Sequence, residues 1–175
     1  MPPDAAMVSI APLRREDIDE IAAAFARLGW HKPASQYERY LEEAVVGVRT
    51  TWVARFGGVF AGYATVCWSP DHPPFRDAGI PEIQDLNVLP EFRRRGIGSR
   101  LMDTAEACVG SRGRRVGIAV GFDPDYGPAQ RMYVVRGYVP DGRGGASHGA
   151  PVRWGDTVTV DDDLLLHIVK TLPGG

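Results

Sequence analysis

A basic turn near the middle of the chain holds the residues best suited to binding an anion. It combines four arginines with two glycines, in the order Arg93, Arg94, Arg95, Gly96, Ile97, Gly98, Ser99 and Arg100. Glycines let a ligand come close to the backbone, and guanidinium groups form strong paired hydrogen bonds with phosphate oxygens. This composition favours a ligand that carries several phosphate groups. The alternative is a solvated basic turn that only caps a structural helix.

The flanking sequence predicts that the turn joins a strand to a helix. Residues 82–89 carry strand-forming apolar side chains, and Pro90 closes the run because proline cannot continue a central ladder. Leu101, Ala105 and Cys108 recur at helical spacing after the turn. The first N–H groups of such a helix have no partners within it and lie at the positive end of its dipole, which suits an anion.

Periodicity and turn residues predict further elements on both sides of this unit. Two β-rich runs separated by Gly57-Gly58 predict a hairpin at 50–68, and the proline-rich loop at 69–79 is long enough to serve a function. The other expected elements are a strand at 7–13, helices at 18–28, 35–44 (with capping-box spacing from Ser35) and 128–136 (ended by Gly137), strands at 114–121 and 164–172, and an irregular glycine-rich tail at 142–151.

The composition is that of an ordinary globular chain, and we expect one domain over residues 1–175. The sequence has 44% hydrophobic and 24% charged residues and a formal net charge of −2. No global field therefore favours nucleic acid or a membrane as partner. Two cysteines form no disulfide framework, and the N-terminus lacks a signal pattern, so a cytoplasmic location is expected.

The motif Arg93-x-x-Gly96-x-Gly98 resembles the acyl-CoA pyrophosphate loop of the GNAT superfamily of N-acetyltransferases. The segment Ala129-x-x-x-Tyr133-x-x-x-Gly137-Tyr138 resembles the family motif around a tyrosine that acts as catalytic acid. The hairpin, the loop and this segment follow one another in the family's order. The resemblance implies an α/β fold with a mixed, twisted sheet of six or seven strands, flanked by about four helices and splayed near residues 86–88.

The resemblance also implies acetyl-CoA as the acyl donor. No metal is expected, because no cluster of His, Cys and Asp residues has metal-ligand spacing. Backbone groups of Leu86, Asn87 and Val88, where the family strand has a bulge, would hold the pantetheine arm. The amides of residues 94–99 would wrap the pyrophosphate, with Arg93 and Arg94 assisting. The chain departs from the family at Tyr126, where an asparagine usually contacts the cofactor arm, and that contact is therefore open.

Acyl transfer to an amine needs a base for the ammonium proton and an acid for the leaving thiolate. Tyr133 is the first candidate for the acid, because a phenol of pKa about 10 can protonate a thiolate of pKa about 8.5. Glu82 is the first candidate for the base, since some family members place a glutamate at this spacing before the loop. The alternatives are a solvated strand-start carboxylate at Glu82, Asp85 as the base, or Asp85 paired with Arg94 or Arg95.

The expected function is transfer of an acetyl group to a primary amine of a small molecule, by direct attack in a ternary complex. Two alternatives stay open: a protein or peptide amine as acceptor, and an acyl-CoA-binding module without turnover. A homodimer is also left open. His31, His72 and His148 fall on expected loops that could face a substrate, whereas His167 is expected to be packed, and no His, Cys and Asp residues show metal-ligand spacing.

Overall fold

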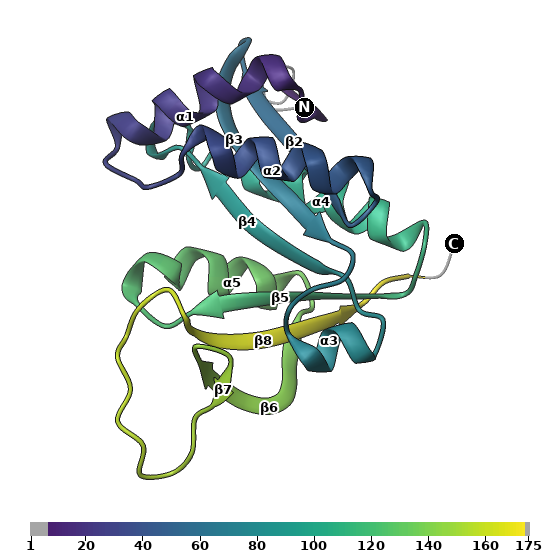
Figure 1. Ribbon diagram of the computed structural model, residues 1–175, viewed down its shortest axis with the longest axis vertical. Coiled ribbons are helices and arrows are strands. Elements are labelled where there is room, and N and C mark those ends of the chain that lie inside the picture. Colours follow the sequence, from purple (N-terminus) through teal and green to yellow (C-terminus); the bar gives the residue numbers. More distant parts are fainter. Residues whose placement is uncertain (1–6, 174–175) are drawn as a thin grey trace. The chain divides into compact units, whose positions relative to one another are not determined.

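The computed structural model describes residues 7–173, and within them the chain forms two compact units (Figure 1). The first unit comprises the residues up to Trp68 together with Gln84–Ala105, and the second comprises Ser69–Ile83 and the residues from Glu106 onward. Residues 1–6 and 174–175 of the expected domain lie outside the described part. Within the described part, no helix combines the length and apolar character needed to cross a membrane.

The first unit contains three complete strands, two complete helices and most of a fourth strand. In chain order these are β1 (Val8–Pro12), α1 (Ile18–Arg27), α2 (Ala34–Val45), β2 (Arg49–Phe56), β3 (Val59–Cys67), residues 84–88 of β4 (Glu82–Val88) and the first part of α4 (Ile97–Gly110). The second unit contains α3 (Pro73–Asp77), the start of β4, the end of α4, β5 (Arg115–Gly121), α5 (Gly127–Val135), β6 (Val139–Ser147), β7 (Ala150–Pro151) and β8 (Leu164–Thr171).

The strands follow the order β1-β2-β3-β4-β5-β8-β6-β7 in one mixed sheet. Among the described strand pairs, β4 and β5 run parallel. In this pair Glu82 lies opposite Gly117, and Ile83 lies opposite Ile118. The predicted α/β class is confirmed. The predicted splay of the sheet is confirmed as well, but β4 stops pairing with β5 after Ile83, which is earlier than the expected residues 86–88. The sheet has eight strands rather than six or seven, and the described residues form five α-helices rather than about four.

The hairpin of β2 and β3 forms where the two glycines predict it. Gly57 and Gly58 have φ angles of +57° and +85°, the left-handed pair that a type I′ turn requires. The helix predicted at 18–28 also forms, with Ile18, Ile21 and Phe25 buried on one face, and its chain turns at Gly29 with φ of +71°. Local sequence rules therefore place the first unit's elements well.

Three local predictions are wrong. The glycine-rich tail at 142–151 is not irregular, since it supplies most of β6 and all of β7; Gly142 and Gly144 adopt positive φ, and the register against β8 shifts between Pro140 and Gly145. A bulged strand can use such glycines. The loop after β3 contains the short helix α3. Ser35 does not cap α2 but lies inside it, because the helix begins at Ala34 and Pro33 is its N-cap residue.

The core of the first unit is aromatic and is built mainly on α1, α2 and β3. The ring centroids of Phe25 and Tyr63 lie 5.8 Å apart at a steep angle, and Trp30 stacks on Phe25 at 5.7 Å. Trp30 is partly buried and packs against this cluster. Trp30 therefore closes the edge of the core.

Gly62 on β3 is required by the close approach of β4. A methyl group at this position would overlap the carbonyl oxygen of Asn87 and come to 3.1 Å from the Cα atom of Val88. Backbone atoms cannot move aside as a flexible side chain can, so we expect Gly62→Ala to lower the free energy of unfolding by about 1–3 kcal/mol. Urea denaturation measures this change. Gly113→Ala is the control, because nothing lies within 4 Å of its Cβ position; equal midpoints for both variants would contradict the prediction.

Candidate functional site

The turn between β4 and α4 presents exposed backbone at the start of a helix. A short 3₁₀ turn, Pro90–Phe92, leads into exposed residues 93–96, where Arg94 and Gly96 adopt φ angles of +61° and +76°. Ile97 is 1% exposed and anchors the first turn of α4 in the core. The N–H groups of Ile97, Gly98 and Ser99 have no acceptors within the helix, because the first acceptor is the Gly96 carbonyl, bound by Arg100. The turn thus presents unpaired backbone N–H groups of the kind that suit an anion.

Arg93 and Arg95 have contacts that hold them on the protein. Arg93 Nε donates a hydrogen bond of 3.2 Å to the Val88 carbonyl at the end of β4. The Arg95 guanidinium lies over the Phe56 ring, 4.8 Å from its centroid. The side chain of Arg94 is exposed. We infer that the backbone N–H groups are the principal anion ligands and that the arginines add charge around them.

Gly98 is not required by the packing of the protein itself. Its φ is outside the left-handed region, and a Cβ atom there would meet only Val88 Cγ2, at an ordinary 3.7 Å. A glycine that the fold does not need, at the start of a helix with exposed N–H groups, leaves room for a ligand close to the backbone. Gly96 differs, because its positive φ alone favours glycine.

The strand before the turn is irregular from Asp85 onward. Asp85 has φ of +50°, and the Asn87 side chain donates a 3.1 Å hydrogen bond to the Asp85 carbonyl. Beyond this point Leu89 N bonds to Ala61 O, at 2.9 Å. The irregularity expected at Leu86, Asn87 and Val88 thus begins one residue earlier. The assignment of these three residues to the pantetheine arm stays a prediction.

Asp85 lies at the centre of a polar cluster in the first unit. Its carboxylate accepts hydrogen bonds from Lys32 Nζ at 3.1 Å, from Gln36 Nε2 at 2.9 Å and from the Tyr40 hydroxyl. Burial raises the pKa of Tyr40, and the negative charge of Asp85 raises it further. The cation that pairs with Asp85 is therefore Lys32 rather than Arg94 or Arg95.

These contacts already occupy the Asp85 carboxylate. Its oxygens accept three hydrogen bonds within the protein, one of them from the Lys32 ammonium, which gives this carboxylate a structural role. The sequence analysis did not single out Lys32, Gln36 or Tyr40. The spacing of four residues between Gln36 and Tyr40 on α2 could have indicated a shared polar point, but it names no partner.

Glu82 is buried at the start of β4. It is 6% exposed and pairs with Gly117 of β5. The interpretation as a solvated strand-start carboxylate is therefore wrong. Carboxylates are rarely this buried unless they are paired or functional. Glu82 thus keeps its place as the candidate base.

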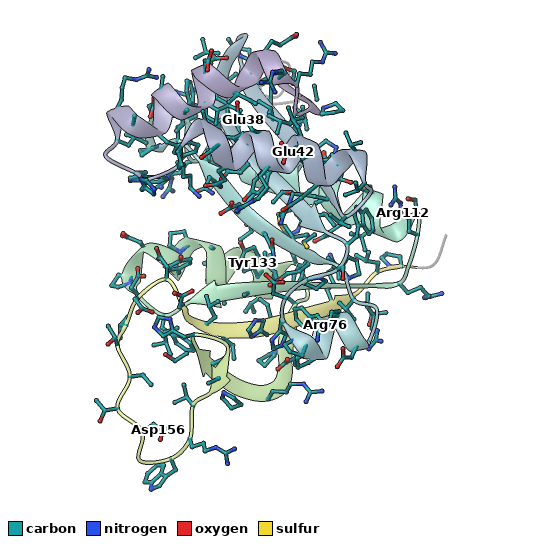
Figure 2. The ribbon with its side chains drawn as sticks, in the orientation of Figure 1. Glu38, Glu42, Arg76, Arg112, Tyr133 and Asp156 are labelled. Carbon is teal, nitrogen blue, oxygen red and sulfur yellow. The ribbon has the colours of Figure 1, made fainter. Side chains whose placement is uncertain are left out.

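Tyr133 lies on α5 and is 5% exposed (Figure 2). Its ring centroid is 5.8 Å from that of Tyr138. Burial raises the pKa of Tyr133 well above its ordinary value, and Tyr126 adds to the effect. A phenol in this environment stays protonated at neutral pH, which an acid catalyst requires.

Tyr126 is held by two contacts within the second unit. It ends the 3₁₀ turn Pro124–Tyr126, and its hydroxyl donates to Asp162 Oδ1 at 3.1 Å. Its ring covers Gly121 so closely that a Cβ atom there would lie 2.5 Å from a ring carbon. The Tyr126 ring, which departs from the family pattern, thus fits because Gly121 on β5 has no side chain. A contact between Tyr126 and the cofactor stays a prediction.

Folding brings together three possible metal ligands that showed no such spacing in the sequence. The donor atoms of His148, Asp161 and Asp163 lie within 4.8 Å of one another. Each ring nitrogen of His148 already faces a carboxylate, Nε2 with Asp161 and Nδ1 with Asp163, both at 3.2 Å. These contacts hold the three side chains together.

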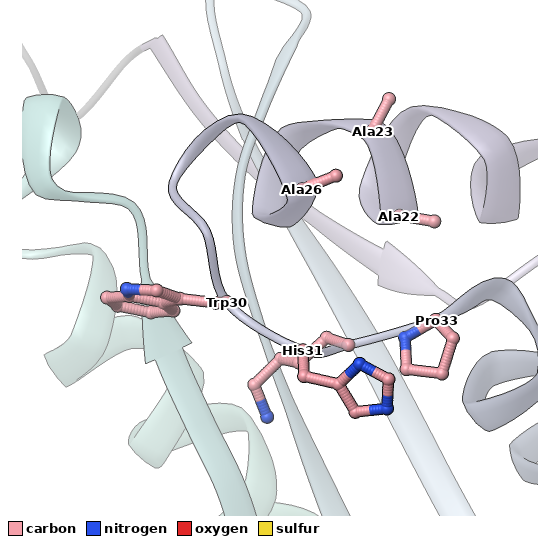
Figure 3. Close-up of a pocket in the computed structure, with 7 residues that line it drawn as sticks. Ala22, Ala23, Ala26, Trp30, His31 and Pro33 are labelled. Carbon is pink, nitrogen blue, oxygen red and sulfur yellow. The ribbon is translucent and has the colours of Figure 1, made fainter.

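A cavity of about 370 Å³ opens beside the loop that follows α1 (Figure 3). Ala22, Ala23 and Ala26 of α1 line it together with His31 and Pro33 of the loop. The small alanines leave the space, and the wall is mainly apolar. Of the three loop histidines, His31 therefore faces this cavity, whereas His148 is held by its carboxylates.

Comparison with known proteins finds a matching family, a curated relative and solved structures with the same fold. The model of the acetyltransferase (GNAT) family matches residues 15–138. A curated relative is an uncharacterised N-acetyltransferase of Chlorobaculum tepidum, 30% identical over 94 residues. That match covers 53% of this chain and 56% of the relative, so the chain spans little more than half of the relative's length.

Solved structures share the fold at low sequence identity. An acetyltransferase from Salmonella typhimurium that modifies the N-terminal serine of ribosomal protein L7/L12 has a TM-score of 0.70 at 10% identity, covering 98% of each chain. A protein from the same organism, solved with its cofactor acetyl-CoA, has a TM-score of 0.64 at 18% identity and 95% coverage of each chain. A spermidine N-acetyltransferase chimera from Vibrio cholerae and a human enzyme has a TM-score of 0.67 at 13% identity, covering 94% of this chain and 95% of the chimera.

Proposed function

The chain belongs to the acetyltransferase (GNAT) family, and on that premise we propose that it is an acetyl-CoA-dependent N-acetyltransferase. The observation that carries the proposal is the exposed turn at the start of α4. Three N–H groups without helical partners, positive φ at two turn residues and four neighbouring arginines suit two linked phosphates. The acceptor that we propose is a primary amine of a small molecule.

The proposed chemistry uses one base and one acid from the second unit. The Glu82 carboxylate takes a proton from the substrate ammonium, and the freed amine attacks the thioester carbonyl carbon. The carbon–sulfur bond then breaks, and the thiolate takes a proton from the Tyr133 hydroxyl. The nitrogen loses its second proton as the amide forms, and this proton restores the Tyr133 hydroxyl. Burial of both groups supports these roles, because a proton moves between them and the substrate without competition from bulk water.

Gly98→Ala provides a direct test of the pyrophosphate site. The methyl group meets only one ordinary contact in the protein, so the melting temperature should stay within about 2 °C of the parent value. The same methyl group limits the approach of a phosphate to the backbone, and we expect the Kd for acetyl-CoA to rise about tenfold or more. Titration calorimetry and a thermal melt measure the two quantities. Unchanged affinity in the folded variant would contradict the assignment of this turn.

The acceptor class can be separated by a thiol-release assay on two sets of amines. Structural neighbours include an enzyme named for spermidine and one that modifies a ribosomal protein. We expect turnover with free small amines and none with peptides that present the same amine at an N-terminus. Turnover with peptides alone would replace the small-molecule proposal with transfer to protein, and intact acetyl-CoA binding without any turnover would favour a binding module.

A further inference from the structure

A second cavity, of about 570 Å³, lies wholly within the second unit. The start of α3 contributes His72 to its wall, β6 contributes Asp141 and Arg143, and β8 contributes His167. Much of the remaining lining is glycine from the strand that the sequence did not predict. The cavity therefore combines polar side chains with a stretch of wall that is mostly backbone.

The two imidazoles form a fixed pair. Their rings stack at 3.5 Å between centroids with an interplanar angle of 4°, and the Phe75 ring stands edge-on to both, at 4.8 Å from His72 and 5.5 Å from His167. Burial lowers the pKa of His72, and burial with the neighbouring His72 lowers the pKa of His167 to about 4. Both rings are therefore neutral at pH 7, and each keeps one nitrogen as an acceptor.

Asp141 leaves one buried carboxylate oxygen without a hydrogen bond. Its side chain is 7% exposed, and Oδ1 accepts from the Arg143 backbone N–H at 3.0 Å. Within the described part of the chain, Oδ2 has no donor, and neither does His72 Nε2, which lies 3.7 Å away. Buried polar atoms are seldom left unsatisfied, so two of them side by side on a cavity wall point to a missing donor.

Arg143 does not supply that donor. Its Nε atom is 3.8 Å from Asp141 Oδ2, beyond hydrogen-bond distance, and its side chain is 64% exposed. A metal ion also fits poorly, because the described residues whose ligand atoms gather within 4.8 Å are His148, Asp161 and Asp163 and not this set. An anion would face the buried carboxylate. Among charged ligands this leaves an ammonium, which can donate to Asp141 Oδ2 and, where His72 carries its proton on Nδ1, to His72 Nε2 at the same time.

The strand register places this cavity close to the candidate base. Glu82 pairs with Gly117, and the Phe75 ring fills the space where a Gly117 side chain would lie. His167 pairs with Ala119, two residues further along β5 on the same face. The two positions differ by two residues along the strands, about 7 Å, and by two strand spacings across β5, about 10 Å, so their backbone atoms are about 12 Å apart. The side chains cover part of this distance, and a flexible molecule with two amino groups can span the rest.

We propose that Asp141 and His72 bind an ammonium group of the acceptor, so that the preferred substrate is a diamine or polyamine whose other amino group reacts. The proposal rests on the proposed acetyltransferase function. The Asp141 carboxylate supplies the charge, His72 Nε2 accepts a second hydrogen bond, and the exposed Arg143 guanidinium competes weakly with the ligand.

The first test is titration calorimetry of the full chain with 1,5-diaminopentane, without acetyl-CoA. We expect Asp141→Asn to weaken diamine binding about tenfold to a hundredfold, the range of a hydrogen bond to a charged group. Asparagine keeps the oxygen that caps the Arg143 N–H, so the fold should persist, which a thermal melt checks. Asp161→Asn is the control for a carboxylate of the same unit and should leave the affinity unchanged.

A second variant keeps the proposal testable if Asp141→Asn does not fold. Removal of the nearest cation in Arg143→Ala should strengthen diamine binding about twofold or more, because the guanidinium no longer competes. Weaker or equal binding would overturn the proposal. So would equal affinities for the parent and Asp141→Asn, absence of diamine binding to the parent chain, or binding of Zn²⁺ alone that Asp141→Asn abolishes.

Turnover separates this proposal from the function on which it rests. With acetyl-CoA present, kcat/KM for 1,5-diaminopentane should exceed that for 1-aminopentane about tenfold or more, and Asp141→Asn should reduce the ratio. Turnover of both amines at equal rates would contradict the ammonium site and support the acetyltransferase function. Diamine binding that depends on Asp141, without turnover of any amine, would support the ammonium site and contradict the acetyltransferase function.

Discussion

Replacing Tyr133 with phenylalanine is expected to lower kcat about 10²-fold or more, while the Kd for acetyl-CoA stays within about twofold of the parent value. The phenol is the proposed proton donor to the thiolate, and phenylalanine keeps the ring that packs near Tyr138. The loss should therefore fall on the chemical step. Steady-state thiol release and calorimetry measure the two effects.

Tyr37→Phe is the matched control. The Tyr37 hydroxyl is also buried, and within the described residues it forms no hydrogen bond. Its removal should change neither rate nor affinity. If Tyr133→Phe kept the parent kcat, the thiolate would have to leave without this acid, and the tyrosine would be a packing residue only.

The pH dependence provides a second check on Tyr133. Burial raises the pKa of Tyr133 above the ordinary phenol value of about 10. The acid form is the active one, so ionisation of Tyr133 should reduce kcat only above about pH 10. A loss of rate between pH 7 and 9 that disappears in Tyr133→Phe would contradict this environment.

Replacing Glu82 with glutamine is expected to lower kcat/KM about 10²-fold at pH 7, with acetyl-CoA affinity retained. The amide has the size of the acid but cannot take a proton from the ammonium. Steady-state thiol release and titration calorimetry with acetyl-CoA measure the two quantities. A kcat/KM equal to that of the parent in the folded variant would rule out Glu82 as the base.

Two further variants decide between the candidate bases. Glu42→Gln alters an exposed glutamate on α2 and should have no effect on rate. Asp85→Asn should act mainly on stability, because the Asp85 carboxylate pairs with Lys32 and accepts from Gln36 and Tyr40. If Asp85→Asn lost more activity than Glu82→Gln in a folded protein, the base would be Asp85.

The proposed ammonium site and the candidate base are connected through one aromatic side chain of the second unit. Phe75 packs on Gly117, and its edge holds the stacked rings of His72 and His167. One aromatic side chain on α3 therefore links the strand that pairs with Glu82 to the wall of the cavity. The short helix α3, in a segment that was expected to be a loop, thus connects the candidate base to the proposed ammonium site.

The sequence by itself determined the elements whose signals are local. The glycine pair at Gly57 and Gly58 determined the hairpin, because only such residues adopt two successive positive φ angles readily. The turn at 93–100 was recognisable because glycines and arginines need no distant partner to create an anion site at a helix start. The α/β class and the family followed from the order of these local signals.

Only the tertiary structure decided which distant side chains meet. Asp85 acquires Lys32 across 53 positions of sequence, and the orphaned acceptors of His72 and Asp141 lie side by side although 69 residues separate them. The glycine-rich tail becomes β6 because β8 supplies hydrogen-bond partners that its own composition does not suggest. Periodicity reports which face of an element is apolar, but a pairing between elements depends on register and packing, and these exist only once the chain has folded.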